Sequence, residues 1–106
     1  MSKINEIFLT MGMKESLLGT GYLRLAVGMY APGISLTKEL YPAVAKLAGS
    51  TPSRVERAMR HAIEAAFDNV GYDVMYCFFG NTIGMESGKV TVGEFLARLA
   101  VLCHED

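Results

Sequence analysis

One short stretch of this 106-residue chain concentrates side chains that could contact nucleic acid. The stretch from Thr51 to Phe67, TPSRVERAMRHAIEAAF, contains three arginines, one histidine and two glutamates. An arginine can donate two parallel hydrogen bonds to guanine, and a glutamate can accept one from cytosine. A serine hydroxyl or a helix N-terminus can bind a phosphate. These groups could act together only if one face of one element presents them.

Helical periodicity places them on one face. At about 100° per residue, the apolar residues gather on one side, namely Val55, Ala58, Met59, Ala62, Ile63 and Ala66. The opposite side is polar and consists of Ser53, Arg57, Arg60 and Glu64, with Arg54 and His61 on one edge and Glu56 on the other. The pattern predicts a helix over Pro52 to Asp68, with a buried apolar face and exposed arginines near its N-terminal half.

The start of this helix can be drawn in two registers. Thr51 before Pro52 is a good N-cap arrangement, because proline suits the first helical position. Ser53 with Glu56 three residues later forms a rival capping box. The sequence leaves both registers open.

The segments around this helix predict a helix-turn-helix. A short helix over Pro42 to Ala48, closed by Gly49, precedes the turn Gly49 to Thr51 and the longer helix. This layout is typical of DNA-binding modules. An ordinary amphipathic surface helix is the competing interpretation, because Glu56–Arg60 and Arg60–Glu64 are i,i+4 pairs of the kind that stabilise exposed helices.

The remaining segments are also helical in pattern, and β-type alternation is missing. The residues Ile4, Ile7, Phe8 and Met11 predict a first helix ended by Gly12, and Tyr22 to Tyr30 predict a second, in which Gly28 is expected to pack closely against a neighbour. Leu36 to Tyr41 and Val74 to Phe79 form further short segments, NTIGMESGK forms a loop, and a Thr91–Glu94 capping box opens a last helix, Val92 to Cys103. The prediction is one all-α domain over residues 1–106, with about six helices.

Composition and motifs narrow the function classes. Apolar residues make up 51% of the chain, which argues against a disordered tail, yet no apolar run is long enough to span a membrane. Cys77 and Cys103 lack metal-type spacing, and we expect buried thiols in a reducing cytoplasm. The adjacent groups of the CHED tail point in different directions, so no metal site is expected there. Nucleophile–base pairs, phosphate loops and HExxH motifs are missing, so the chain is predicted to be no enzyme and to need no cofactor.

The charges are unevenly distributed along the chain. Residues 1–60 contain eight Lys/Arg and four Asp/Glu, whereas residues 61–106 contain two and seven. Such asymmetry indicates a basic face for an anionic partner. The alternative is that halves of the sequence do not correspond to faces in space.

Several segments resemble one known family, the C-terminal effector domain of the stage-zero sporulation response regulator. TPSRVERAMRHAIE resembles its recognition helix, GYLRLAV its second helix and LYPAVAK the entry to its helix-turn-helix. FFGNTI and KVTVGEFLARLA resemble its last loop and last helix, so the match covers nearly the whole chain. The resemblance implies a six-helical transcription regulator in the cytoplasm that binds a TGTCGAA-like box, often as tandem molecules.

The resemblance also implies partners and contacts. The partners would be double-stranded DNA, a second copy of the chain on adjacent sites, and RNA polymerase. Base edges would be contacted by Glu56, Arg57 and Arg60, and phosphates by Ser53, Arg54, His61, Lys46 and Thr51.

The chain departs from the family in three ways. The receiver domain of the family is absent from this sequence. Asp68 and Leu47 occupy places where relatives tend to carry basic or polar groups, and both changes reduce attraction to phosphates. These departures support an alternative function, a protein-interaction module that blocks a relative and binds DNA weakly.

Overall fold

The computed structural model describes residues 3–80, 83 and 90–104, and these residues form helices and connecting turns without a strand. The elements are α1 (Lys3–Thr10), α2 (Leu18–Met29), a single wide π-helical turn η1 (Leu36–Leu40), α3 (Tyr41–Ala48), α4 (Pro52–Phe79) and α5 (Val92–His104). The predicted all-α class is confirmed, and the number of helices is close to the six expected.

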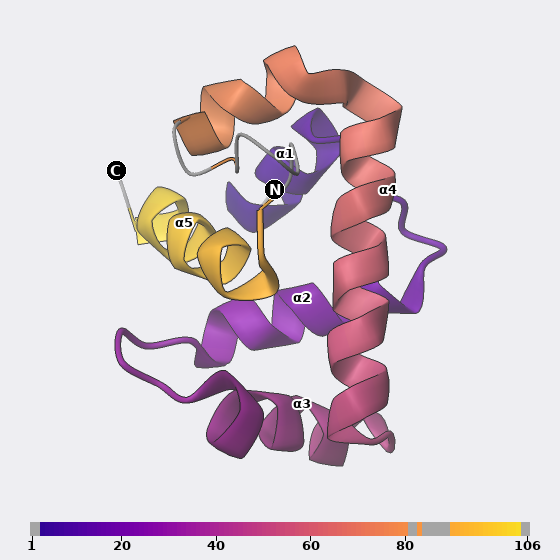
Figure 1. Cartoon of the computed structure of the whole chain (residues 1–106), viewed down its shortest axis with the longest axis vertical. Helices are drawn as coiled ribbons and strands as arrows, with labels where there is room; N and C mark the ends of the chain where they lie inside the picture. The colour runs from indigo at the N-terminus through magenta and orange to yellow at the C-terminus, as the bar shows by residue number, and fades with distance from the viewer. Residues whose placement is uncertain (1–2, 81–82, 84–89, 105–106) are drawn as a thin grey trace.

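Helix α4 runs along the length of the molecule, and α2, α3 and α5 pack against it (Figure 1). The most extensive contact is with α2, which approaches α4 through Gly19. A Cβ atom on Gly19 would lie 1.9 Å from the carbonyl oxygen of Ala58, so only glycine permits this backbone contact. Helix α2 begins at Leu18 rather than at Tyr22 as predicted, because its first turn forms this contact.

The expectation for Gly28 is wrong. Gly28 is exposed, and a Cβ atom there would meet no atom of the described residues within 4 Å. The glycine that packs closely in α2 is Gly19, the second residue of the helix, whereas Gly28 is the last but one.

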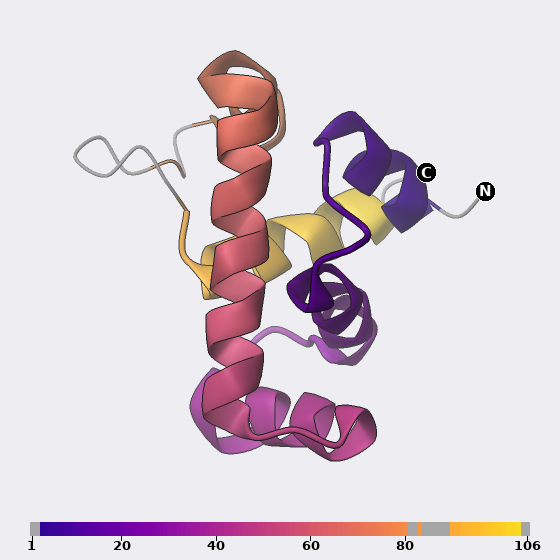
Figure 2. The same ribbon diagram turned by 90° about the vertical axis from the view of Figure 1, so that its right-hand side faces the viewer.

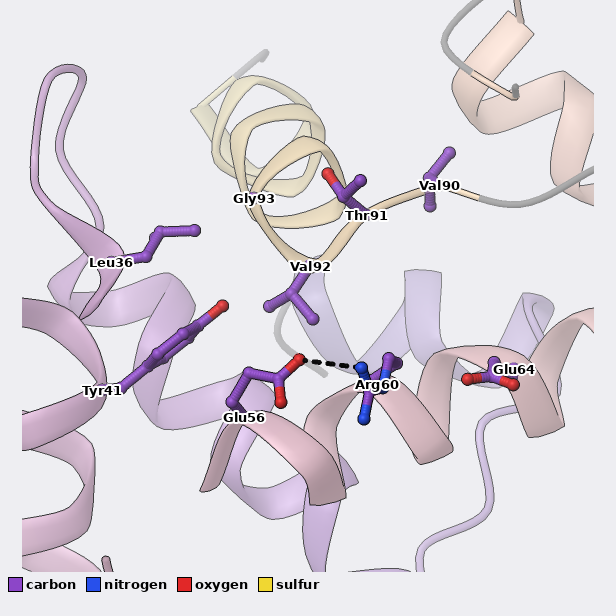
Figure 3. A pocket seen from close by; sticks show the side chains of 9 residues that line it. All are labelled: Leu36, Tyr41, Glu56, Arg60, Glu64, Val90, Thr91, Val92 and Gly93. Carbon is purple, nitrogen blue, oxygen red and sulfur yellow. Dashed lines mark ion pairs between the residues drawn. The ribbon is translucent and has the colours of Figure 1, made fainter. Parts of the chain in front are cut away.

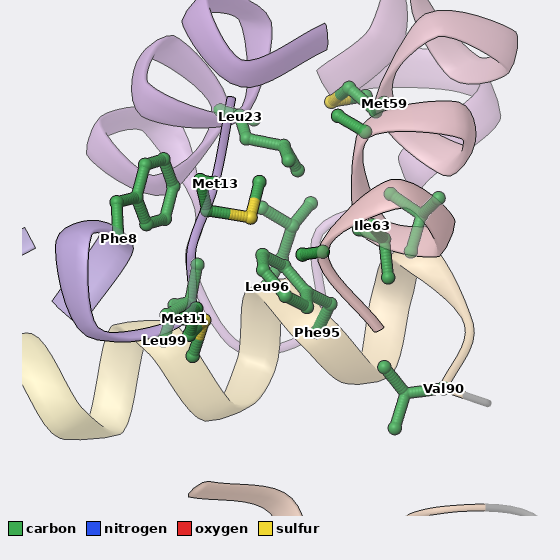
Figure 4. Packing of buried hydrophobic residues seen from close by; sticks show 14 of the residues in the cluster. Phe8, Met11, Met13, Leu23, Met59, Ile63, Val90, Phe95, Leu96 and Leu99 are labelled. Atoms are coloured by element: carbon green, nitrogen blue, oxygen red, sulfur yellow. The ribbon is translucent and has the colours of Figure 1, made fainter. Parts of the chain in front are cut away.

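One apolar core joins all the helices (Figure 4). Phe8 of α1 and Leu23 of α2 pack in it together with Met59 and Ile63 of α4. Phe95, Leu96 and Leu99 of α5 are each 0% exposed and complete it. Burial of these side chains holds the helices together, because apolar surface removed from water is the main favourable contribution to folding.

Gly71 breaks α4 into two parts. Its backbone angles, φ 82° and ψ 173°, lie in a region that essentially only glycine occupies. In a straight helix, Phe67 and Phe79 would be separated by about 18 Å along the axis. Their ring centroids are instead 6.5 Å apart, and Phe79 also stacks on Phe95 of α5 at 5.2 Å. The bend therefore folds the end of α4 back over the core, as its upper end shows in Figure 1.

Other sequence predictions fare differently. The Thr91–Glu94 capping box is confirmed, since the backbone N–H of Glu94 donates to Thr91 Oγ1 at 3.1 Å and that of Thr91 donates to Glu94 Oε1 at 2.9 Å. The predicted loop NTIGMESGK, residues 81–89, lies outside the described residues except for Ile83. The expectation of two buried thiols is wrong, because Cys103 is only half-buried and Cys77 is exposed. Cys77 is exposed because Met75 and Phe79, two residues away on either side, face the core.

Two further facts concern ligands and membranes. In residues 3–80, 83 and 90–104 no three metal-ligating side chains come together. The side chains of His104 and Glu105 in the CHED tail lie outside the described set. None of the described helices has the length and apolar character needed to cross a bilayer.

Candidate nucleic-acid interface

The N-terminal half of α4 and helix α3 form one end of the molecule (Figures 1 and 2). The turn between them is short. Helix α3 ends at Gly49, in the left-handed conformation, and α4 begins at Pro52. This is the predicted helix-turn-helix, with Tyr41 rather than Pro42 as the first residue of its short helix.

The Thr51 register is the one that forms at the start of α4. The Oγ1 atom of Thr51 accepts a hydrogen bond from the backbone N–H of Arg54 at 3.3 Å. The capping box of Ser53 and Glu56 does not form, because Ser53 already lies within the first turn. The Thr51 hydroxyl accepts one bond in this cap and keeps its own proton for donation to a ligand. The remaining free N–H groups of the first turn and the helix dipole favour an anion at the same place.

The two faces of the helix lie as the periodicity predicts. Val55, Met59 and Ala62 are 0% exposed and Ile63 is 2% exposed. The predicted contact residues on the other side are exposed, except for Glu56, which is half-buried; the exposed ones are Ser53, Arg54, Arg57, Arg60 and His61. The buried stripe fixes the rotation of the helix, and this rotation turns the arginines outward.

Glu56 and Arg60 form an ion pair with an Oε1–Nη1 distance of 3.5 Å. Figure 3 shows the Glu56 carboxylate between Tyr41 and Arg60, beneath Val92 at the start of α5. Burial raises the pKa of the Tyr41 phenol; the nearby Glu56 carboxylate raises this pKa further, and Arg60 opposes the rise. An ion pair this exposed contributes only about 0.2–1 kcal/mol to stability, so its arrangement matters more for orientation than for folding.

An open groove lies beside this pair. It is bounded by the start of α3 and the first turns of α4, and its lining includes Thr37, Tyr41, Ser53, Arg57 and Arg60. A second hollow, shown in Figure 3, lies on the other side of the pair and is lined by Leu36, Glu64, Thr91 and Val92 among others. Tyr41, Glu56 and Arg60 line both hollows.

The structure brings most of the predicted contact residues to one end of the molecule. Thr51, Ser53, Arg54 and Arg57 lie on the turn and the first two turns of α4, and Lys46 lies exposed in the last turn of α3. Arg60 and His61 follow one turn further along α4. The side chains of Lys46, Arg54 and Arg57 form no ion pair within the part of the chain that the structure describes.

The two unfavourable positions are also exposed. Leu47, beside Lys46, is 65% exposed. Asp68 is exposed two turns beyond Arg60, about 12 Å along the helix. Neither position adds positive charge to this end of the molecule.

Sequence reasoning missed two neighbours of the site, Tyr41 and Val92. Tyr41 appeared only as the end of a short helix, and Val92 only as the start of the last one. Both lie beside Glu56 through tertiary packing across 15 and 36 residues of sequence. No local pattern signals contacts of this kind.

A comparison with known protein families agrees with this geometry. The model of the family described as sporulation initiation factor Spo0A C terminal matches residues 4–102. The matched range includes the helix-turn-helix and every residue of the proposed interface. The chain therefore belongs to the Spo0A C-terminal family, a family of DNA-binding effector domains of sporulation regulators and not of enzymes.

Proposed function

We propose that this chain regulates transcription by binding a TGTCGAA-like DNA box through residues 52–68 of α4. Base edges are contacted by the group formed by Glu56, Arg57 and Arg60. Phosphates are contacted by Ser53, Arg54, His61, Lys46 and Thr51. The observation that carries this proposal is the exposed position of Arg57 and Arg60 on a helix whose opposite face packs into the core. A helix held in this way can enter a major groove without losing its contacts to the core.

The exposed positive charges on α3 and the first turns of α4 are complementary to the phosphates of a DNA duplex. Lys46, Arg54 and Arg57 are exposed cations without carboxylate partners among the described residues, so each can neutralise a phosphate or meet a base. Neutralising phosphates releases counterions, which gives binding its salt dependence. The capped N-terminus of α4 adds backbone donors to the same surface.

A second candidate function rests on Leu47 and Asp68. An exposed leucine and an exposed carboxylate beside the interface weaken attraction to phosphates. A chain with such substitutions could act instead as a protein-interaction module that pairs with a relative and binds DNA weakly.

Selection of binding sites from random duplex DNA tests the proposal. We expect enrichment of one short box, and we expect fluorescence titrations on this box and on a scrambled duplex to give a specificity ratio of at least about 10³. Arg54→Ala should weaken binding to both duplexes alike and lower the salt slope by about one. Equal affinity for both duplexes at every salt concentration would favour the interaction module.

Assembly on DNA is part of the same proposal. We expect a monomer or a weak dimer in solution and pairing on adjacent boxes, where a shared duplex raises the effective concentration of the second copy. RNA polymerase is the further partner that we propose, and the cytoplasm is the proposed location. Sedimentation without DNA checks the first point, since a tight dimer there would contradict it.

A further inference from the structure

We propose that Glu56 acts in base recognition through Arg60, as a positioning residue, and does not itself accept a hydrogen bond from a base. This inference rests on the proposed function, because it assigns roles within the group that contacts base edges. The resemblance to the family places Glu56, Arg57 and Arg60 together. The geometry distinguishes their roles: Glu56 holds Arg60, whereas Arg57 has no ion pair with any described residue.

The position of the Glu56 side chain is the first argument. It is 33% exposed, whereas the side chain of Arg60 is 57% exposed. Its carboxylate lies between Tyr41 and Arg60, beneath Val92 (Figure 3). Tyr41 and Val92 are themselves buried, each at 6% exposure, so they form a firm wall. A side chain that accepts from a base edge must extend outward from the helix, and Glu56 is turned toward this wall.

The chemistry of the pair is the second argument. A guanidinium group has five N–H donors, and the contact with Glu56 uses Nη1. The other donors remain available for a bidentate contact with guanine. Fixing one edge of the group lowers the conformational entropy that Arg60 loses on binding. The pair therefore presents an arginine that is already oriented.

Electrostatics supports the same assignment. A lone carboxylate near a duplex is repelled by the phosphates. Pairing with Arg60 at 3.5 Å compensates this charge. Arg57, one turn earlier on the same face, has no carboxylate partner in the described part of the chain. It serves as the internal comparison, because its contact with a base would not depend on Glu56.

The test combines site selection with a double-mutant cycle. The variants are Glu56→Ala, Glu56→Gln, Arg60→Ala and the double variant with alanine at both positions. Glu64→Ala is the matched control, because it removes the same charge one turn beyond Arg60 on the same helix. Thermal melts of all variants confirm that the fold is retained.

We expect Arg60→Ala and Glu56→Ala to relax the preference for a base at the same position of the box. Arg60→Ala should relax preference at one base position, by roughly 5- to 150-fold. Glu56→Ala should relax the same position by about 2- to 5-fold, the effect of an exposed pair. It should change nothing further in the Arg60→Ala background. Glu56→Gln, which keeps an acceptor of the same length, should recover part of the preference, and Glu64→Ala should leave it unchanged.

Four results would overturn the inference while leaving the proposed function in place. Relaxation at a different base position, or a persistent effect in the Arg60→Ala background, would make Glu56 a direct base contact. Equal strengthening of all sequences would make it only a repulsive charge. If the wild-type chain selected no sequence, the proposed function itself would fail. If it did select one while Glu56→Ala left the Arg60 position intact, only this inference would fail.

A measurement without DNA completes the design. The Nε–Hε signal of Arg60 in nuclear magnetic resonance should broaden or exchange faster in Glu56→Ala than in the wild type, while that of Arg57 should not change. An unchanged Arg60 signal would show that Glu56 does not hold the guanidinium group in solution and would contradict the inference.

Discussion

The two parts of α4, before and after Gly71, use the same kind of apolar stripe but carry different exposed faces. The first part buries Met59 and Ile63, and the second buries Met75 and Phe79. The first three turns expose the three arginines at positions 54, 57 and 60. From Tyr72 to Phe79 the helix contains one acidic residue, Asp73, and no lysine or arginine. The apolar stripe determines how each part packs against the core, and the exposed face determines which ligands each part can bind.

The exposed aromatic residues sharpen this difference. Tyr72 and Tyr76 stack on each other with centroids 5.7 Å apart and are 54% and 46% exposed. A phosphate backbone is not attracted to this aromatic face, which has one carboxylate and no cation. If the chain binds DNA as proposed, the first part should respond to charge changes and the second should not.

The largest effect on stability is expected on the apolar face of the first part, which packs into the core. Met59→Asp buries a carboxylate without a partner, because Met59 is 0% exposed and surrounded by apolar side chains. We expect destabilisation by more than about 4 kcal/mol, enough to unfold a domain of this size. Circular dichroism during heating measures it. Met59→Leu, which roughly conserves volume, is the control and should cost less than about 1.5 kcal/mol. A cooperative melt of Met59→Asp near the wild-type temperature would contradict the assignment of this face.

The next effect concerns the join between the two parts. Gly71→Ala places a Cβ on a backbone that favours glycine, although no atom of the residues that the structure describes lies within 4 Å of it. The strain should cost about 1–3 kcal/mol and loosen the stacking of Phe79 on Phe67 and Phe95. Gly28→Ala is the matched control, because Gly28 is exposed and helical; this change should be neutral or stabilise by up to about 1 kcal/mol. Equal melting temperatures of the two variants would show that the break at Gly71 is not required.

Met59 and Gly71 also show which features of the fold could be predicted from the sequence. The spacing of Val55, Met59 and Ile63 predicted the buried face of α4, because local helical periodicity is sufficient to define it. The stop at Gly71 was foreseen only as a gap between two predicted helices. The close approach of Gly19 to Ala58 was not foreseen, and Gly28 was chosen in its place. Contacts across 39 residues depend on how helices cross, which a single sequence does not reveal.

The site was predictable to a similar extent. The exposure of Arg54 and Arg57 follows from the helical wheel, and the Thr51 cap was one of two registers that the sequence allowed. The half-buried position of Glu56 was not predictable, because Tyr41 and Val92 come from other helices. Local pattern thus located the interface, and tertiary packing decided how one of its side chains is turned.

A binding effect of intermediate size is expected from the first part of α4 alone. Arg57→Ala should cost about 1–3 kcal/mol on the preferred box and relax preference at one base position, since a bidentate contact with guanine would be lost. Fluorescence titration on preferred and scrambled duplexes measures both changes. Lys14→Ala removes the same charge from an exposed position between α1 and α2 and should leave base preference intact. Unchanged affinity and preference with an intact fold would show that α4 does not contact the bases, and would favour the interaction module.

The smallest effect compares one charge reversal on each side of Gly71. Asp68→Arg replaces an exposed carboxylate at the end of the first part with a cation, and Asp73→Arg makes the same change in the second part. Because nonspecific affinity depends on phosphate attraction, Asp68→Arg should strengthen binding to every duplex and steepen the salt slope by at most about one. Asp73→Arg, beyond the bend, should change the slope much less. Titrations of both variants at several salt concentrations measure the difference. Equal steepening by both changes would mean that the duplex attracts the whole of α4 through net charge, and the functional division at Gly71 would then be lost.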